Sequence, residues 1–253
     1  MKRRIFYLGY IQNLRQMNKF ISLSLIFFCF FSCNSEKSNN GIYIQGGGTL
    51  NDWANLSKYA SSNDELKKEY VADRIIFMGN SITEGWSSLN PNFFITNPFV
   101  NRGISGQTTP QMLIRFKPDV VNLMPKAVVI LAGINDIAGN TGPVEIDNIA
   151  ENIFSMAEIA KANNIGVYIC SVLPAKDFPW SPGLNPAEKV VKLNNILEEY
   201  SKNNNIKYID YYSEMNDGKG GLKVPDFTSE DDLVHPNKLG YSVMESIVLS
   251  ALD

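Results

Sequence analysis

Histidine is almost missing from this sequence, since His235, close to the C-terminus, is the only one among 253 residues. Histidine is the usual zinc ligand, and the three cysteines, Cys29, Cys33 and Cys170, form no cluster that could replace it. The sequence therefore argues against a catalytic metal site. It also leaves a single candidate for any reaction that needs an imidazole.

The sequence also has no large excess of positive or negative charge. The formal net charge is -3, and no stripe of basic residues with interleaved aromatics occurs, so nucleic acid is not an expected partner. With 44% hydrophobic and 19% charged residues, the composition is that of an ordinary globular protein. The length suits one α/β domain with an N-terminal appendage.

The longest N-terminal apolar run, residues 20–31, falls short of the ~20 residues that a membrane-spanning helix needs. Basic residues precede it, and Cys33 follows it directly after a small residue, which resembles the lipobox of bacterial lipoproteins. We expect residues 1–33 to be a signal peptide with Cys33 as the lipid anchor, and residues 34–48 to be a flexible tether. The chain would then be exported and anchored to a bacterial membrane, on its periplasmic or cell-surface side. Plain secretion is the alternative.

Export in this form would leave no disulfide in the mature chain. Cys29 would be removed with the signal peptide, Cys33 would carry lipid, and Cys170 would stand alone in an apolar strand. Cys170 is a weak candidate for a nucleophile because buried strand cysteines are mostly inert.

After the tether, short apolar runs alternate with longer amphipathic segments. Residues 49–72 predict an N-terminal strap, helical or broken by turns, packed on a main domain at 73–253. Runs such as AVVILA and VYICSV are typical of strands buried on both faces of a parallel sheet. Strands are expected at 74–78, 99–101, 127–132, 166–172 and 206–211, and helices at 110–123, 143–163, 186–203 and 236–249. The alternation indicates a three-layer α/β/α domain with a five-stranded parallel sheet.

Polar residues follow several of these strands, at the sheet edge where ligands bind in such folds. Ser81, in Gly79-Asn80-Ser81, comes at a sharp turn into a helix, where its N–H and the helix dipole can face developing negative charge. A serine in this place is more often a simple helix cap. The segment is not the Gly-x-Ser-x-Gly elbow of α/β-hydrolases, since Thr83 fills the last position.

Two further strand ends carry candidate donors for an oxyanion. Gly103, in NRGISG, has no side chain in the way of its N–H, and Asn135, in GIND, could donate its side-chain amide. Each also has an ordinary explanation as turn chemistry.

The fourth segment is Asp232-Leu-Val-His235-Pro236. If a helix begins at Pro236, His235 stands on a loop that can reach into the site, and Asp232 can accept its second N–H. An exposed loop histidine is the alternative.

Together these segments resemble the SGNH hydrolases, also called the GDSL-like lipase/acylhydrolase family. The matching residues are Ser81 in GNSIT, Gly103 in NRGISG, Asn135 in GIND and His235 in DDLVHP. The resemblance implies a flavodoxin-like α/β/α fold, Ser81 as nucleophile, His235 as general base and Asp232 as its orienter. It further implies an oxyanion hole from the Ser81 N–H, the Gly103 N–H and the Asn135 amide, without a metal or other cofactor.

The substrate class is less specified. RGISG and GIND look closest to the platelet-activating-factor acetylhydrolase-like branch, which favours small acyl groups. Asn80 replaces the more usual Asp of the first segment, and we expect Asn80, Trp86 and Trp180 to contact substrate. The leading hypothesis is a serine ester hydrolase that removes small acyl groups, O-acetyl above all, from carbohydrate. A lysophospholipase or longer-chain lipid esterase is one alternative, and a non-catalytic glycan-binding lipoprotein is another.

Overall fold

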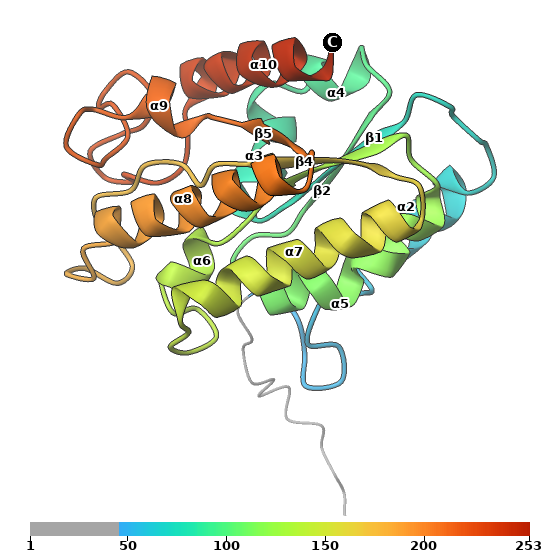
Figure 1. Ribbon diagram of the computed structural model, residues 1–253, viewed down its shortest axis with the longest axis horizontal. Helices are drawn as coiled ribbons and strands as arrows, with labels where there is room; N and C mark the ends of the chain where they lie inside the picture. The colour runs from blue at the N-terminus through green and yellow to red at the C-terminus, as the bar shows by residue number, and fades with distance from the viewer. Residues whose placement is uncertain (1–45) are drawn as a thin grey trace, which may run out of the picture. The chain divides into compact units, whose positions relative to one another are not determined.

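The computed structural model describes residues 46–253. Its centre is a parallel sheet of five strands in the order β2-β1-β3-β4-β5 (Figure 1). The strands are β1 (Ile75–Gly79), β2 (Phe99–Gly103), β3 (Ala127–Leu131), β4 (Gly166–Cys170) and β5 (Lys207–Ile209). The predicted three-layer α/β/α fold with a five-stranded parallel sheet is confirmed. The predicted signal peptide, the Cys33 anchor and residues 34–45 of the tether lie outside the described residues.

Helices cover both faces of the sheet. One layer contains α5 (Thr109–Asp119), α7 (Ile146–Ala162) and α8 (Ala187–Asn203), and the other contains α3 (Ser81–Leu89) and α10 (Lys238–Leu252) (Figure 1). The shorter helices are α2 (Ala60–Leu66), α4 (Asn92–Ile95), η1 (Val121–Leu123), α6 (Ile134–Ile137) and α9 (Tyr212–Met215). Because α3 directly follows β1, the edge of the sheet at the strand ends also carries a helix N-terminus.

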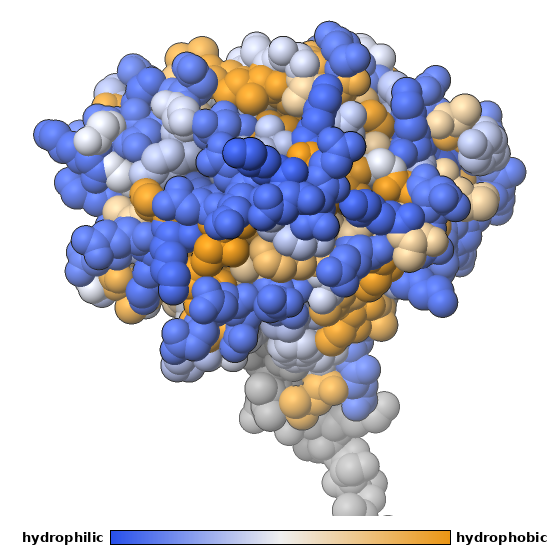
Figure 2. Space-filling view, viewed as in Figure 1, coloured by the Kyte–Doolittle hydropathy of each residue, from blue (hydrophilic) through white to orange (hydrophobic). Residues whose placement is uncertain are grey.

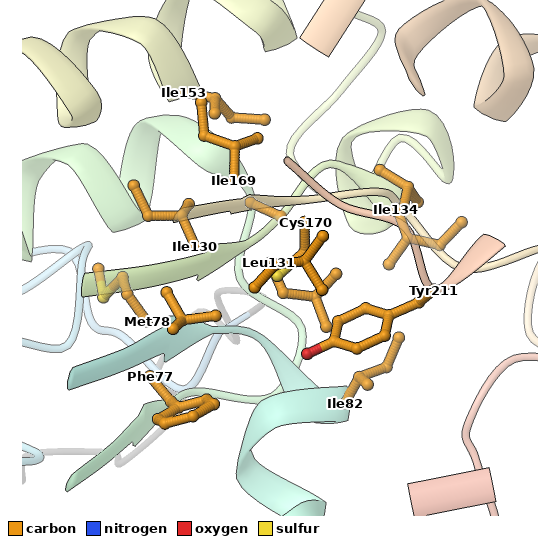
Figure 3. Packing of buried hydrophobic residues seen from close by; sticks show 14 of the residues in the cluster. Phe77, Met78, Ile82, Ile130, Leu131, Ile134, Ile153, Ile169, Cys170 and Tyr211 are labelled. Atoms are coloured by element: carbon orange, nitrogen blue, oxygen red, sulfur yellow. The ribbon is translucent and has the colours of Figure 1, made fainter. Parts of the chain in front are cut away.

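Two inner strands of the sheet, β1 and β3, are buried along their whole length. Every residue of β1 and of β3 is buried, as expected for strands covered by helices on both faces. Ile82 and Ile134, which are neighbours of candidate site residues, belong to the same core cluster (Figure 3). The turns that carry the site therefore rest directly on the core, which limits their freedom to move.

The N-terminal strap is fastened to the main domain by buried polar groups. Asn63 of α2 donates to Asp119 at 2.6 Å, and Arg115 donates to Asp119 at 3.0 Å and to the Gly79 carbonyl at 2.8 Å. Arg102 donates to Asn63 at 2.8 and 2.9 Å. Since Gly79 is the last residue of β1, this network connects the strap to the strand that precedes Ser81.

The surface carries no large apolar area on the face that Figure 2 shows, where hydrophilic side chains dominate and apolar ones form separate patches. Among the helices of residues 46–253, none is both long and apolar enough to cross a membrane.

Candidate active site

The turn between β1 and α3 places Ser81 as the first residue of the helix. A Cβ on Gly79 would lie 1.9 Å from Thr83 Oγ1, so the strand can end here only with glycine. Asn80 is the N-cap, and its side-chain oxygen accepts from the Ile82 N–H at 3.1 Å. The Ser81 N–H is one of the helix's first amides, which have no carbonyl partner within the helix.

The structure does not support Asn80 as a substrate contact. Its side chain is 1% exposed and is occupied in capping α3, so this prediction was wrong. Asn can replace Asp here because both side chains offer the oxygen that an N-cap needs.

Ser81, His235 and Asp232 form a connected triad. Ser81 Oγ lies 2.8 Å from His235 Nε2, and His235 Nδ1 lies 2.8 Å from Asp232 Oδ1 and 3.1 Å from Oδ2. A carboxylate only accepts hydrogen bonds, so the proton on Nδ1 faces Asp232 and the Nε2 lone pair faces the serine hydroxyl. The side chains of His235 and Asp232 are 32% and 39% exposed, which leaves the histidine open to substrate.

The loop before α10 holds this histidine by its backbone as well. Asp232 Oδ1 also accepts from the backbone N–H of His235 at 2.8 Å and of Val234 at 3.2 Å, while the His235 carbonyl accepts from Thr228 Oγ1 at 2.9 Å. Asn237 caps α10 directly afterwards. One carboxylate therefore fixes both the loop and the imidazole tautomer.

Asn135 lies in the first turn of α6 and lines the pocket that contains the serine. Its Nδ2 donates to the Gln107 carbonyl at 2.9 Å, which uses one of its two amide protons. The other proton is left for a ligand, and Asn135 lines the same pocket as Ser81 and His235.

Gly103, by contrast, does not supply an oxyanion donor in this structure, which corrects the prediction. Its N–H donates to Asn101 Oδ1 at 2.8 Å, and a Cβ at this position would lie 2.2 Å from the Glu84 backbone nitrogen. Gly103 therefore serves the close packing of β2 against α3. Gly106 of the same motif lines the pocket instead, and within residues 46–253 its N–H donates to no protein group.

Of the two tryptophans expected at the substrate, only Trp180 lies there. Trp86 is 1% exposed, stacks on Phe93 with ring centres 4.9 Å apart and donates to Glu245 at 2.9 Å. It is a core residue, and its prediction as a substrate contact was wrong. Trp180 is 45% exposed, and its ring centre lies 6.1 Å from that of His235.

The pocket that contains the triad serine is small and is lined mostly by small or polar residues. It has a volume of about 290 Å³. Its lining residues are Ser81, Ser105, Gly106, Asn135, Asn140, Trp180 and His235. Ser105 and Gly106 were not predicted to line the pocket, although both belong to the NRGISG motif. Asn140 was missed because its contact, a donation from Nδ2 to the Gly106 carbonyl at 3.0 Å, joins two loops distant in sequence.

Asp136, which follows Asn135 in α6, is buried and does not line this pocket. Its carboxylate accepts from Thr109 Oγ1 at 2.6 Å and from the Thr109 N–H at 3.0 Å, which connects α6 to the N-terminus of α5. Burial raises the pKa of Asp136 to about 6, and the hydrogen bonds from Thr109 offset only part of that effect. Cys170 is buried and burial raises the pKa of its thiol, so it has no place in this chemistry. Residues 46–253 contain no group of three or more His, Cys, Asp or Glu side chains that could hold a metal ion.

Known structures agree with this architecture. A presumed acylhydrolase from Bacteroides fragilis is 46% identical over 79% of this chain and 97% of its own, with a TM-score of 0.75. A GDSL-like lipase from Bacteroides thetaiotaomicron is 47% identical over the same shares, with a TM-score of 0.74. A mutant of Axe2, an acetyl-xylooligosaccharide esterase from Geobacillus Stearmophilus, is 18% identical over 73% of this chain and 96% of its own, with a TM-score of 0.59, and shows a likeness of fold alone.

A search of curated proteins found no match. Residues 77–243, however, match the GDSL-like Lipase/Acylhydrolase family, and this range contains the triad, Asn135 and Gly106. The chain belongs to the GDSL-like lipase/acylhydrolase family.

Proposed function

We propose that this chain is a serine ester hydrolase that removes small acyl groups, chiefly O-acetyl, from carbohydrate. The observation that carries the proposal is the Ser81 Oγ to His235 Nε2 distance of 2.8 Å within a small pocket. The same distance argues against the alternative of a glycan-binding protein without catalysis, since such a protein has no need of an activated serine.

The geometry supports an acyl-enzyme mechanism. Ser81 Oγ bonds to the ester carbonyl carbon as His235 Nε2 takes the hydroxyl proton, and the carbonyl oxygen becomes an oxyanion. The Ser81 N–H, the Gly106 N–H and the free proton of Asn135 Nδ2 are the donors for it. The tetrahedral species then breaks its bond to the alcohol oxygen, which receives the proton from His235. Water, deprotonated by His235, attacks the acyl-enzyme, and the acid leaves as Ser81 regains its proton.

The pocket favours a short acyl chain. Six of its lining residues are Ser, Gly, Asn or His, and Trp180 is the one large apolar side chain among them. A fatty acyl chain needs a continuous apolar wall, because each buried CH₂ contributes about 0.8 kcal/mol only where water is excluded. The lining therefore supports acetyl over long chains, in line with the platelet-activating-factor acetylhydrolase-like branch that the motifs resemble, and against the lysophospholipase alternative.

Support for carbohydrate as the carrier comes from the surroundings of the pocket. Trp180 offers an exposed ring face beside the triad. A second cavity of about 590 Å³ is lined by Asp136 and Ile137 of α6 and by Leu184, which follows Trp180 in the same loop. Its lining mixes Val144 and Leu184 with Asn148, Glu145 and Lys189, a combination that suits the apolar faces and hydroxyls of sugar rings. The fold likeness to an acetyl-xylooligosaccharide esterase is consistent with this carrier.

Acetate release from acetylated xylo-oligosaccharides, compared with fatty-acid release from lysophospholipid micelles, tests the carrier. The proposal expects acetate release with kcat/KM at least tenfold above that on p-nitrophenyl acetate. Hydrolysis of the lysophospholipid with the higher kcat/KM would replace the proposal by the lipid alternative.

We also propose that the chain is exported and anchored through Cys33, on the resemblance of its N-terminal segment to a lipoprotein signal. Expression of the full chain in a Gram-negative host with radiolabelled palmitate tests this. The label is expected on the chain, absent from Cys33→Ser and retained by the matched control Cys29→Ser. An unlabelled chain in the culture medium would point to plain secretion instead.

A further inference from the structure

The loop that carries Gly106 is bonded to α3 through Ser105, whose backbone N–H and hydroxyl both donate to the carboxylate of Glu84. Glu84 Oε2 accepts from the Ser105 N–H at 2.6 Å and from Ser105 Oγ at 2.5 Å. Glu84 stands one helical turn after Ser81, so the helix that presents the nucleophile also holds the residue before Gly106. Glu84 itself does not line the pocket.

The other carboxylate oxygen of Glu84 belongs to the strap. Lys58 Nζ donates to Glu84 Oε1, and the two side chains are 28% and 32% exposed. Burial alone would raise the pKa of Glu84, but the hydrogen bonds from Lys58 and Ser105 outweigh it and hold the pKa below its ordinary value. Glu84 is thus ionised at neutral pH, with Lys58 on one oxygen and Ser105 on the other.

Different residues donate hydrogen bonds to the backbone carbonyls of the same loop. Asn140 donates to the Gly106 carbonyl at 3.0 Å and Asn135 donates to the Gln107 carbonyl at 2.9 Å. Gly106 has a φ of +78°, a left-handed conformation, and because glycine has no Cβ, no side chain of its own restricts how the backbone turns here. The direction of its N–H must therefore come from its neighbours, and Glu84 fixes the neighbour on the N-terminal side.

We propose that Glu84, held in place by Lys58 of the strap, is a positioning residue that orients the Gly106 N–H toward the oxyanion through Ser105. The inference rests on the proposed ester hydrolysis and assigns a role in it to the N-terminal strap. Oxyanion donors act only when they are already aligned at the moment charge develops. Loss of Glu84 should therefore slow the chemical step and leave ground-state binding nearly unchanged.

The test uses the full mature chain with p-nitrophenyl acetate and four variants. Removing one oxyanion donor lowers kcat on the order of 10²–10³-fold, and misaligning a donor should lower it less. Glu84→Ala is therefore expected to lower kcat by about 10- to 100-fold and to change KM by no more than about twofold. Lys58→Met should give a smaller loss of the same kind, and Lys58→Arg should recover it because it restores the donor. Lys68→Met removes a strap lysine that pairs with Glu65 at 2.7 Å and does not line the pocket, so it is the matched control and should leave kcat unchanged.

The inference is overturned if Glu84→Ala keeps the parent's kcat, or if Lys58→Arg is as slow as Lys58→Met. It is equally overturned if the variants lose kcat only in proportion to a loss of folded protein, measured by circular dichroism at the assay temperature. A parent chain without esterase activity would instead defeat the proposed function itself, and the inference with it.

Discussion

Ser81 Oγ and His235 Nε2 lie 2.8 Å apart, although 154 positions of sequence separate the two residues. They meet because α3 starts at the end of the inner strand β1 and because α10, which follows the histidine loop, packs against α3. Tyr241 of α10 donates to the Ile82 carbonyl at 2.7 Å, which fixes this pairing next to the serine.

The triad predicts an order of severity among its alanine variants. His235→Ala should lower kcat on p-nitrophenyl acetate by about 10⁵–10⁶-fold, and Asp232→Ala by about 10⁴-fold, because the general base is lost in the first and only its orientation in the second. KM should change little. Steady-state kinetics would measure this, and an Asp232→Ala variant as active as the parent would contradict the assigned role of Asp232.

Trp86 and Trp180 should respond to substitution in opposite ways. Trp86→Ala is expected to lower the free energy of unfolding by about 3–5 kcal/mol, since it empties a fully buried site in the core. Trp180→Ala should change it by no more than about 0.5 kcal/mol, as a surface substitution does, and should raise KM for acetylated oligosaccharide. Urea titration and kinetics on both variants check this. A core-like loss of stability in Trp180→Ala would show that its ring serves packing instead.

Asp136 predicts a particular dependence of stability on pH. Its pKa is raised to about 6 in the folded chain from an ordinary value of 3.8, so the folded state binds the proton more tightly than the unfolded state. Its contribution to stability is therefore fully present below about pH 3.8 and is lost as pH rises through about 6. Other carboxylates, such as Glu84 with its lowered pKa, act in the opposite direction.

The difference between the parent and Asp136→Asn isolates this effect. Urea unfolding at pH 4.5 and pH 7 should show the parent losing stability relative to the variant as pH rises. A constant difference across this interval would mean that Asp136 does not titrate there.

The buried pair of Arg115 and Asp119 predicts a strong response when one partner is removed. Asp119→Ala should lower the free energy of unfolding by about 3–5 kcal/mol, because it leaves the Arg115 charge buried and unpaired. The double variant Arg115→Met with Asp119→Leu should lose less than the sum of the single losses. Strict additivity in urea titrations would mean that the two charges are not coupled.

Strand positions and the pairing of Asp232 with His235 followed from the sequence because their signals are local, whereas the role of Ser81 as nucleophile was implied by the resemblance to the SGNH hydrolases. β1 and β3 are continuous apolar runs, and the Asp-x-x-His spacing allows one carboxylate to reach both the backbone and the ring of His235. Trp86 could have been assigned to the core as well, since it falls on the same helical face as the buried Ile82 and Thr83.

Other parts of the site depend on contacts that the sequence does not encode locally. NRGISG contains two glycines, and the sequence does not show which of them faces the pocket. In the structure the Gly103 N–H is bonded to the Asn101 side chain and Gly103 packs against the Glu84 backbone, whereas Gly106 lines the pocket. Likewise, the hydrogen bonds from Lys58 and from Ser105 to Glu84 join segments that are far apart in the chain. In the sequence alone, Lys58 and Glu84 look like ordinary surface charges.

The central claim is that Ser81 carries out hydrolysis of short acyl esters. Hydrolysis of p-nitrophenyl esters from acetyl to palmitoyl by the mature chain, beside Ser81→Ala, tests it most directly. The account predicts turnover of the acetyl and butyryl esters, a steep fall with longer chains, and loss of activity by at least about 10⁴-fold in the variant. Activity that rises toward palmitoyl, or that survives in Ser81→Ala, would contradict it.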